Sequence, residues 1–391
     1  MTGLTAAQTA WYLAAVAELR SSCRLYDIHV HPYEVLFDRF SYGASQVGPG
    51  VWSLPGKSYA PPATGPLKLS EVPESCPEPR SQRLCDIGVM LLSRVYGSVG
   101  PRVFLDHMEL SGVDQVLLLP VASEKSDSAQ FDLRMQWILD LYGADPRFWL
   151  AGSIPPAVEW DEIERYAASL KKRFGIRALK CHPVVSGIDL GTGRGKAWLE
   201  ALLEACQRLA LPLVIHGGSN NPYWGGARGN FGSLRHLVEI NLSLSRFPVV
   251  LAHAGLHRCT TAEMKADGLA LLKQMLDRHN NLYVDISGLE FEQLSLVVDS
   301  IGQERILFGS DALYAPQWEV VAATVHALRR SGRGWQDRFL QYASINPQKV
   351  FDTAVPCAET AAASRSAIDN LTKSSPKSPP FSITDIQILA R

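Results

Sequence analysis

Seven side chains that can bind a metal ion or move a proton stand at the ends of short apolar segments. Imidazole and carboxylate groups suit Zn, Fe, Mn or Ni, and a catalytic site leaves one coordination position for water. Two of the segments end in a pair of such residues at i, i+2 spacing, which points both side chains to one face of an extended strand. Six of the seven would serve as ligands in a two-metal site. The seven residues are His29, His31, Lys180, His182, His216, His253 and Asp311.

Each of these residues has a simpler interpretation when it is taken alone. Two histidines on one strand can satisfy each other, and a single strand-end histidine such as His216 or His253 is often a hydrogen-bonded core residue. Asp311 follows Gly-Ser and can cap the next helix. Their joint placement at corresponding strand ends is what favours a metal centre, and a barrel with a purely structural metal is the plain alternative.

The elements that must position these residues are eight short segments rich in apolar and β-branched residues. Most of them are separated by stretches of helical periodicity, and this alternation predicts parallel strands with right-handed crossovers. The helical stretch between the fourth and fifth segments has apolar residues from Trp198 to Leu209, and the one after the eighth has them from Trp318 to Leu328. The eight segments are 24–32, 114–121, 148–155, 176–184, 212–218, 248–255, 281–288 and 305–312.

An α/β fold of the closed (β/α)8 TIM-barrel type is preferred over an open doubly wound sheet. The open sheet would show a Gly-rich phosphate-binding turn after its first strand, whereas this chain has His-Val-His-Pro there. Residues 1–23 are expected to hold an N-terminal helix, residues 24–353 the barrel, and residues 354–391 a low-complexity tail with a terminal strand. A long insertion after strand one, at about 33–83, is expected to form an ordered cover over the barrel mouth.

Composition narrows the classes of protein to which the chain can belong. Lys and Arg number 38 against 39 Asp and Glu, so the basic surface of a nucleic-acid binder is not expected. Seven cysteines without a C-x-x-C pair fit reduced thiols, with Cys206 in the core. The apolar run 11–17 is far shorter than the roughly 20 residues that a membrane span needs. We therefore expect a cytoplasmic protein with a small-molecule partner, no membrane partner, and a homodimer as an open alternative.

The sequence resembles the amidohydrolase superfamily, and within it the amidohydrolase-2 group that includes aminocarboxymuconate-semialdehyde decarboxylase. The resemblance spans roughly residues 24 to 353 and excludes the insertion and the tail. It rests on these motifs: Asp27-x-His29-x-His31-Pro32, Gly175-x-x-x-x-Lys180-x-His182-Pro183, Ile215-His216-Gly217, Leu251-Ala252-His253-Ala254-Gly255, Asn281-x-Tyr283-x-Asp285-x-Ser287-Gly288, Leu307-Phe308-Gly309-Ser310-Asp311 and Asn346-Pro347-x-x-Val350-Phe351.

The resemblance implies roles for the strand-end residues. His29, His31, His216 and Asp311 match metal-ligand positions, and Asp311 also orients or deprotonates the metal-bound water. His253 matches an acid or base in members with one metal and a ligand of the second metal in members with two. Lys180 matches a lysine that is carboxylated in several binuclear members and bridges both metals; the alternative is a lysine paired with Asp285 or with a substrate carboxylate.

Metal-activated water acting on a C–N or C–O bond is the activity that we expect first, with zinc as the preferred divalent ion, manganese or iron as alternatives, and one or two ions per chain. A metal-dependent decarboxylase is the second interpretation, and an O2-using di-iron enzyme is the third. The substrate is expected to be small and aromatic or carboxylate-bearing, with His182, Tyr223, Trp224 and Arg228 as candidate contacts.

Four further histidines, His107, His236, His279 and His326, fall on presumed helices or their ends and are expected at the surface.

Overall fold

The computed structural model describes residues 4–32, 52–54, 57–59, 101–124, 126–218, 229–312, 315–332 and 334–351. Within the predicted insertion, the described part is an antiparallel pair of short strands, β2 (Trp52–Leu54) and β3 (Lys57–Tyr59). The predicted cover, the candidate contacts Tyr223, Trp224 and Arg228, and the predicted tail 354–391 otherwise lie outside the described residues.

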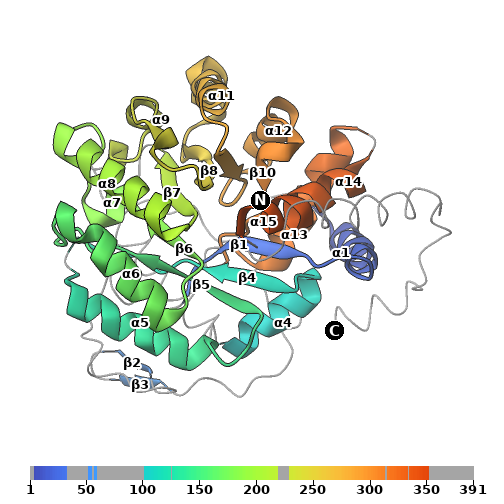
Figure 1. Ribbon diagram of the computed structural model, residues 1–391. Coiled ribbons are helices and arrows are strands. Elements are labelled where there is room, and N and C mark those ends of the chain that lie inside the picture. The colour runs from blue at the N-terminus through green and yellow to red at the C-terminus, as the bar shows by residue number, and fades with distance from the viewer. Residues whose placement is uncertain are drawn as a thin grey trace.

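Eight parallel strands follow one another around a barrel in chain order, so the predicted (β/α)8 fold is confirmed (Figure 1). Hydrogen bonds from the backbone N–H of Ile28 to the carbonyl of Phe308 (3.1 Å) and from that of His31 to Ala312 (3.0 Å) close the ring between the first strand and the segment after the last. Each of the eight predicted segments corresponds to one strand, and only β8 extends past its predicted end, by two residues beyond 255. The strands are β1 (Tyr26–Val30), β4 (Gln115–Leu118), β5 (Phe148–Ser153), β6 (Ala178–Cys181), β7 (Leu213–Gly218), β8 (Val249–His257), β9 (Leu282–Asp285) and β10 (Ile306–Leu307).

Helices surround the barrel and cover its outer face (Figure 1). The apolar stripes predicted from the sequence are buried on α8 and α13, from Trp198 to Cys206 and from Trp318 to Leu328. The α-helices are α1 (Ala6–Arg20), α4 (Pro101–Ser111), α5 (Ser128–Tyr142), α6 (Ile163–Phe174), α7 (Pro183–Ser186), α8 (Gly193–Leu209), α9 (Leu234–Leu237), α10 (Thr261–Glu263), α11 (Leu269–Arg278), α12 (Phe291–Ser300), α13 (Gln317–Arg330), α14 (Trp335–Leu340) and α15 (Asn346–Phe351). Short 3-10 segments are η3 (Trp160–Glu162), η5 (Leu242–Leu244) and η7 (Gln303–Arg305), and π-helical segments are η6 (Met264–Gly268) and η8 (Gln341–Ile345).

Local sequence accounts for where several helices begin. The N-terminal helix expected before the barrel starts after Thr5, whose hydroxyl accepts from the backbone N–H of Gln8 while the Gln8 side chain accepts from the backbone of Thr5. This reciprocal capping satisfies two donors that a helix start leaves unpaired. Thr192 caps α8 with its side chain alone, which accepts from the backbone N–H of Gly195.

The barrel interior is apolar at one end and lined by buried titratable side chains at the other. One apolar cluster gathers side chains from all eight strands together with Val350 and Phe351 of α15. On β6, Ala178 of this cluster is followed two residues later by Lys180, and on β7 Val214 is followed by His216. Because side chains alternate between the two faces of a strand, residues two apart share the inner face. This alternation therefore places Lys180 and His216 on the inner face of the barrel, next to the apolar cluster.

Two of the histidines expected at the surface are buried, so that prediction was wrong for them. His107 on α4 and His279 after α11 are 6% and 2% exposed, whereas His236 and His326 are partly exposed. Periodicity indicates that these residues lie on helices or at their ends. Whether a side chain at a helix end is buried depends on the neighbouring elements that pack against it. Cys206 lies in the core as expected, and Cys23, Cys181, Cys206 and Cys259 are free thiols.

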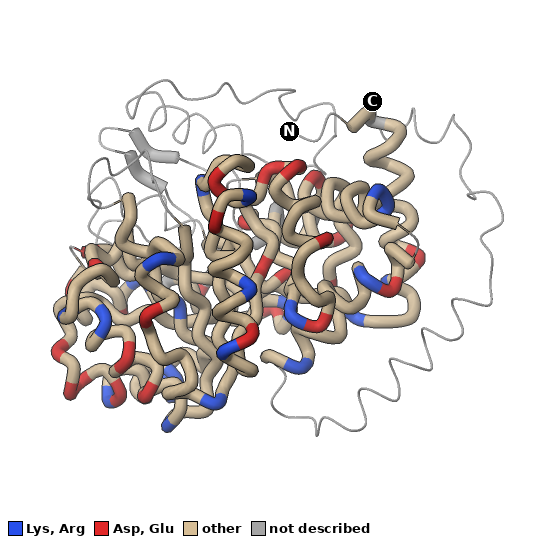
Figure 2. The backbone as a smooth tube through the Cα atoms, turned by 90° about the horizontal axis from the view of Figure 1, so that it is seen from above, with Lys and Arg blue, Asp and Glu red and all other residues tan. Residues whose placement is uncertain are grey.

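The charged residues are mixed in sign over the described chain. Lys and Arg positions alternate with Asp and Glu positions around the barrel (Figure 2). Among the described helices, none combines the length and the apolar character that crossing a bilayer requires.

Candidate metal centre

The strand ends bring the seven predicted residues to one buried mouth of the barrel. His29 and His31 come from β1, Lys180 and His182 from β6 and the residue after it, His216 from β7 and His253 from β8. Asp311 follows β10 and donates its backbone N–H to the carbonyl of His29 at 2.8 Å. All seven are at most 8% exposed.

The donor atoms of His29, His31 and Asp311 form a compact triangle. The two Nε2 atoms of the histidines are 3.1 Å apart, and Oδ1 of Asp311 lies 3.6 Å from Nε2 of His29 and 3.2 Å from that of His31. Ligands about 2.05 Å from a tetrahedral Zn²⁺ stand about 3.3 Å from one another. The triangle therefore has the size that a tetrahedral divalent ion requires.

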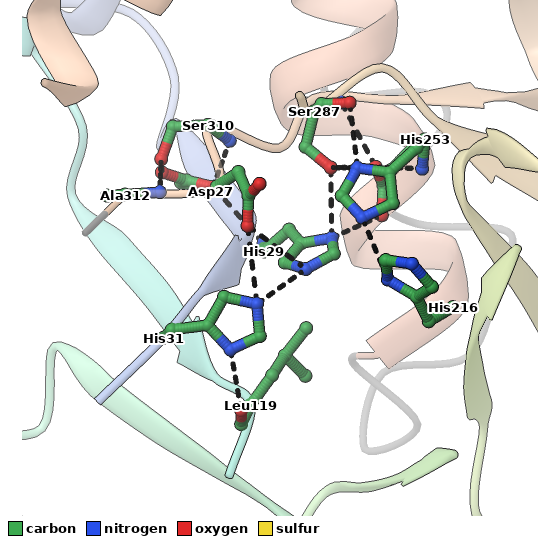
Figure 3. A network of polar contacts seen from close by, with 11 residues as sticks. Asp27, His29, His31, Leu119, His216, His253, Ser287, Ser310 and Ala312 are labelled. Carbon is green, nitrogen blue, oxygen red and sulfur yellow. Dashed lines mark hydrogen bonds and ion pairs between the residues drawn. The ribbon is translucent and has the colours of Figure 1, made fainter. Parts of the chain in front are cut away.

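Hydrogen bonds at the Nδ1 atoms of His29 and His31 orient the two rings so that Nε2 faces this triangle. Nδ1 of His29 lies 2.9 Å from Oδ2 of Asp285, and Nδ1 of His31 lies 3.0 Å from the carbonyl oxygen of Leu119 (Figure 3). Both acceptors require the proton on Nδ1, which leaves a lone pair on each Nε2. Two lone pairs and a carboxylate oxygen thus meet with no proton between them, and a bound cation would compensate that repulsion.

Asp285, at the end of β9, is a site residue for which the sequence suggested only an ion pair with Lys180. Its Oδ1 accepts from the backbone N–H groups of His253 and Ser287, both at 3.0 Å, and from the Ser287 hydroxyl at 2.5 Å. Burial acts to raise the pKa of Asp285, but the interaction with His29 and the hydrogen bond from Ser287 outweigh it and hold the pKa below its ordinary value. Asp285 therefore carries a negative charge that orients His29 and His253. Its place at a strand end was the signal available in the sequence.

Asp27 is a second residue whose part in the site the sequence left unassigned. It is fully buried on β1 and accepts from the backbone N–H and the hydroxyl of Ser310, at 2.9 and 2.5 Å, and from the Gln317 amide at 2.7 Å. Burial raises the pKa of Asp27 to about 6, although these donors oppose the shift. The contacts hold the segment that carries Asp311 against β1.

A second group of histidines lies beside the triangle. Nε2 of His253 is 3.1 Å from Nδ1 of His216, while Nδ1 of His253 lies 2.9 Å from the carbonyl oxygen of Ser287 (Figure 3). His182 stacks on His216 with ring centroids 3.7 Å apart, and its Nδ1 accepts from the backbone N–H of Val185 at 3.4 Å. Stacking and capping together place His182 against His216.

Burial keeps the imidazoles of His29, His216 and His253 in the neutral form that binds metal ions. It lowers the pKa of His29 to about 3, with a further contribution from the charge of Lys180. It also lowers the pKa of His216 well below its ordinary value and lowers that of His253.

Lys180 is buried among these residues without a hydrogen-bond partner for Nζ in the described part of the chain. Burial lowers its pKa to about 8, while the charges of Asp285 and Asp311 oppose that shift. An amine with such a pKa is partly neutral at mildly alkaline pH, so it can act as a nucleophile as well as a cation.

The backbone is strained at two of the candidate ligands. His253 and Asp311 have φ values of 57° and 59°, a left-handed conformation that non-glycine residues rarely adopt. Such conformations cost about 1–3 kcal/mol each and are concentrated at functional sites. At Gly288, which has φ of 60°, a Cβ atom would stand 2.8 Å from Nδ1 of His253. Glycine at this position therefore leaves room for the His253 ring.

Comparisons with known proteins agree with this architecture. A family model described as amidohydrolase matches residues 104–362, about two thirds of the chain, and begins after His29 and His31. No curated protein matches the sequence significantly. The 5-carboxyvanillate decarboxylase LigW of Sphingomonas paucimobilis is similar in structure, with 15% identity and a TM-score of 0.51 over 85% of this chain and 99% of that one. The apo form of IDCase from Metarhizium anisopliae has 18% identity and a TM-score of 0.50 over 85% and 98%. At such identities these two likenesses concern the fold alone.

Proposed function

Because the chain belongs to the amidohydrolase family, in its amidohydrolase-2 group, we propose that it is a metal-dependent hydrolase acting on a C–N or C–O bond of a small molecule. The observation that carries the proposal is the triangle of His29, His31 and Asp311, in which three lone-pair atoms stand 3.1 to 3.6 Å apart. Zinc is the ion that we expect, with manganese or iron as alternatives.

A divalent ion bound there would lower the pKa of water toward about 7 and polarise the bond to be cleaved. Asp311 supplies the carboxylate that takes up a proton. Burial acts to raise its pKa, but the hydrogen bond with His31 and the interactions with His253 and His29 hold the pKa well below its ordinary value. Asp311 is therefore ionised at neutral pH and ready to accept a proton.

His253 is the second proton-transfer residue of the proposal. Its Nδ1 is engaged by the carbonyl oxygen of Ser287 at 2.9 Å, so Nε2 is the atom that faces the mouth. A neutral imidazole in this orientation has a lone pair on Nε2, so it can take up a proton there and release it afterwards. The same lone pair could bind a second ion, which His253 would share with His216.

Lys180 belongs to the proposal in one of two states. As a neutral amine, its Nζ would form a bond with the carbon of CO2 while one C=O π bond opens to an oxyanion and one N–H proton passes to solvent. The resulting carbamate would supply carboxylate oxygens as metal ligands. As an ammonium group, it binds a substrate carboxylate. Its burial, its unpartnered Nζ and its pKa of about 8 support both states.

The substrate class that we propose is a small aromatic or carboxylate-bearing molecule. His182 presents an imidazole that stacks on His216 at the mouth, which supports a contact with a planar group. Tyr223, Trp224 and Arg228 remain predictions from the sequence.

A decarboxylase is the second candidate, and the buried ammonium of Lys180 favours it. A cation that has no hydrogen-bond partner among the described residues and lies beside the candidate ligands fits a substrate that enters with a carboxylate. The decarboxylase of Sphingomonas paucimobilis is an example of a similar barrel associated with that chemistry.

Isotope and gas measurements on the metal-loaded protein separate the candidates. The chain is incubated in ¹⁸O-water with aromatic amides, esters and lactones and with the corresponding free acids. Hydrolysis places ¹⁸O in the product, decarboxylation releases CO2, and an oxygenase consumes O2. We expect ¹⁸O incorporation that chelation abolishes and Zn²⁺ restores. CO2 release without cleavage of any amide or ester would contradict hydrolysis in favour of the second candidate.

A further inference from the structure

His257, at the last position of β8, lies against the two histidines of the second group. Its ring centroid is 4.5 Å from that of His253 and 4.9 Å from that of His216. One ring nitrogen from each of the three lies within 4.8 Å of the other two. The pair His29 and His31 has a similar centroid separation of 5.0 Å, and its nearest nitrogens are 3.1 Å apart. The three rings are thus close enough to converge on one ion after small rotations.

A turn within β8 brings His257 to this place. In a straight strand the Cα atoms of His253 and His257 would lie about 13 Å apart, at about 3.3 Å per residue. Instead His253, Ala254 and Gly255 have φ values of 57°, 53° and 70°, so the chain turns back on itself between the two histidines. Because of this strained turn, the His257 ring lies beside the rings of His253 and His216; a regular strand would place it farther from them.

The neighbouring strand is shaped to accept His257. Gly218, the last residue of β7, pairs with His257 after a register shift that follows His216. A Cβ atom on Gly218 would stand 2.5 to 2.6 Å from the carbonyl oxygen, the nitrogen and the Cβ of His257, and its φ is 141°. Only glycine permits this approach, which places His257 next to His216.

His257 also has a donor atom to spare. Its Nδ1 is buried and has no hydrogen-bond partner among the described residues. A buried polar atom without a partner loses its hydrogen bond to water and gains none in the protein, so it calls for a compensating role. By contrast, the grouping of His29, His253 and Asp285 is already explained, because Oδ2 of Asp285 accepts from Nδ1 of His29 at 2.9 Å.

We propose that His257 is the third protein ligand of a second divalent-ion position, which it forms with His216 and His253 beside the triangle of His29, His31 and Asp311. The inference rests on the proposed function because both positions share one mouth. Three neutral imidazoles leave the full charge of the ion uncompensated and one tetrahedral position open. Such a ligand set suits Zn²⁺ or Co²⁺, whereas Mg²⁺ and Mn²⁺ prefer oxygen ligands.

Cobalt titration of the metal-free full chain tests this position. His257→Phe keeps a ring and removes both nitrogens, and His257→Ala is a second variant in case the phenyl ring disturbs packing. His236→Phe is the matched control, because His236 is also partly buried with an unpartnered Nδ1 but lies on α9 outside the three rings. The readouts are Co²⁺ bound per chain, the visible absorption of bound Co²⁺, and the thermal midpoint of each metal-free variant.

We expect two Co²⁺ per chain in the unaltered protein and in the His236 variant, and a weakening of the second equivalent by at least about 10²-fold in both His257 variants. Removing a residue that only hydrogen-bonds to a metal ligand weakens metal affinity by up to about 10²-fold, so removing a ligand itself should weaken it by at least that factor. Two equivalents of unchanged affinity in a folded His257 variant would overturn the role of His257. A single equivalent in the unaltered protein would overturn the second position and leave the proposed function standing, whereas no bound Co²⁺ would overturn both.

Discussion

Replacing Asp285 by asparagine should weaken metal binding while leaving the fold intact. Oδ1 of Asp285 accepts from the backbone N–H groups of His253 and Ser287 and from the Ser287 hydroxyl, and an asparagine carbonyl can keep these bonds. Its NH2 group then takes the place of Oδ2, 2.9 Å from Nδ1 of His29. Two donors would face each other, so His29 would move its proton to Nε2 and lose the lone pair that faces Asp311.

The expected size of the effect follows from that single altered contact. Loss of a residue that orients a metal-binding histidine costs about 10- to 100-fold in affinity, or about 1.4–2.7 kcal/mol. The effect on Zn²⁺ or Co²⁺ affinity should therefore lie in this range. The larger value is expected because the tautomer that the asparagine amide favours carries a proton on Nε2 of His29, the atom that must bind the metal.

Competition with a chromogenic chelator measures the affinity, and circular dichroism verifies that the variant is folded. Asp114→Asn is the control, since Asp114 also accepts from a charged group and a backbone N–H, at 2.7 Å from Arg20 and 2.8 Å from Leu25, but stands outside the metal site. A folded Asp285→Asn protein that binds metal as tightly as the control would refute the assignment of Asp285 as the residue that orients His29.

Three further outcomes are expected. Asp311→Asn should lower turnover by at least about 10²-fold, because it removes the negative charge that binds metal and accepts a proton; near-normal kcat would exclude Asp311 from the reaction. Chelation should abolish activity reversibly but leave the far-UV circular dichroism of the barrel, whose core is apolar, and cooperative unfolding on chelation would indicate a purely structural metal instead. His107→Leu should reduce the loss of unfolding free energy in acid. Burial lowers the pKa of His107 to about 4, so the folded protein takes up a proton there less readily than the unfolded chain, whose histidine has a pKa near 6.5. The stability that is fully present above pH 6.5 is therefore lost as the pH falls toward 4, by up to about 1.4 kcal/mol per pH unit. An unchanged slope of unfolding free energy against pH in this variant would contradict that account.

The sequence by itself determined the barrel and most of its reactive mouth. Apolar segments alternating with helical stripes require parallel strands, and the period of two along a strand places Lys180 and His216 above the inner-face residues Ala178 and Val214. The i, i+2 spacing of His29 and His31 likewise predicted that both rings would lie on one face of the strand, and in the structure their Nε2 atoms are 3.1 Å apart. These properties depend only on local periodicity, which can be read from residue types.

Only the tertiary structure decided which groups surround those side chains. Asp285 reaches His29 across 256 positions of sequence, and Asp27 reaches Ser310 across 283. His257 joins His253 because three successive left-handed residues fold β8 back, a conformation that Ala254 does not favour by its own propensity. Residue type and spacing specify where a side chain stands along its own strand, but long-range packing determines the partners it meets and can hold the backbone in conformations that local preference opposes.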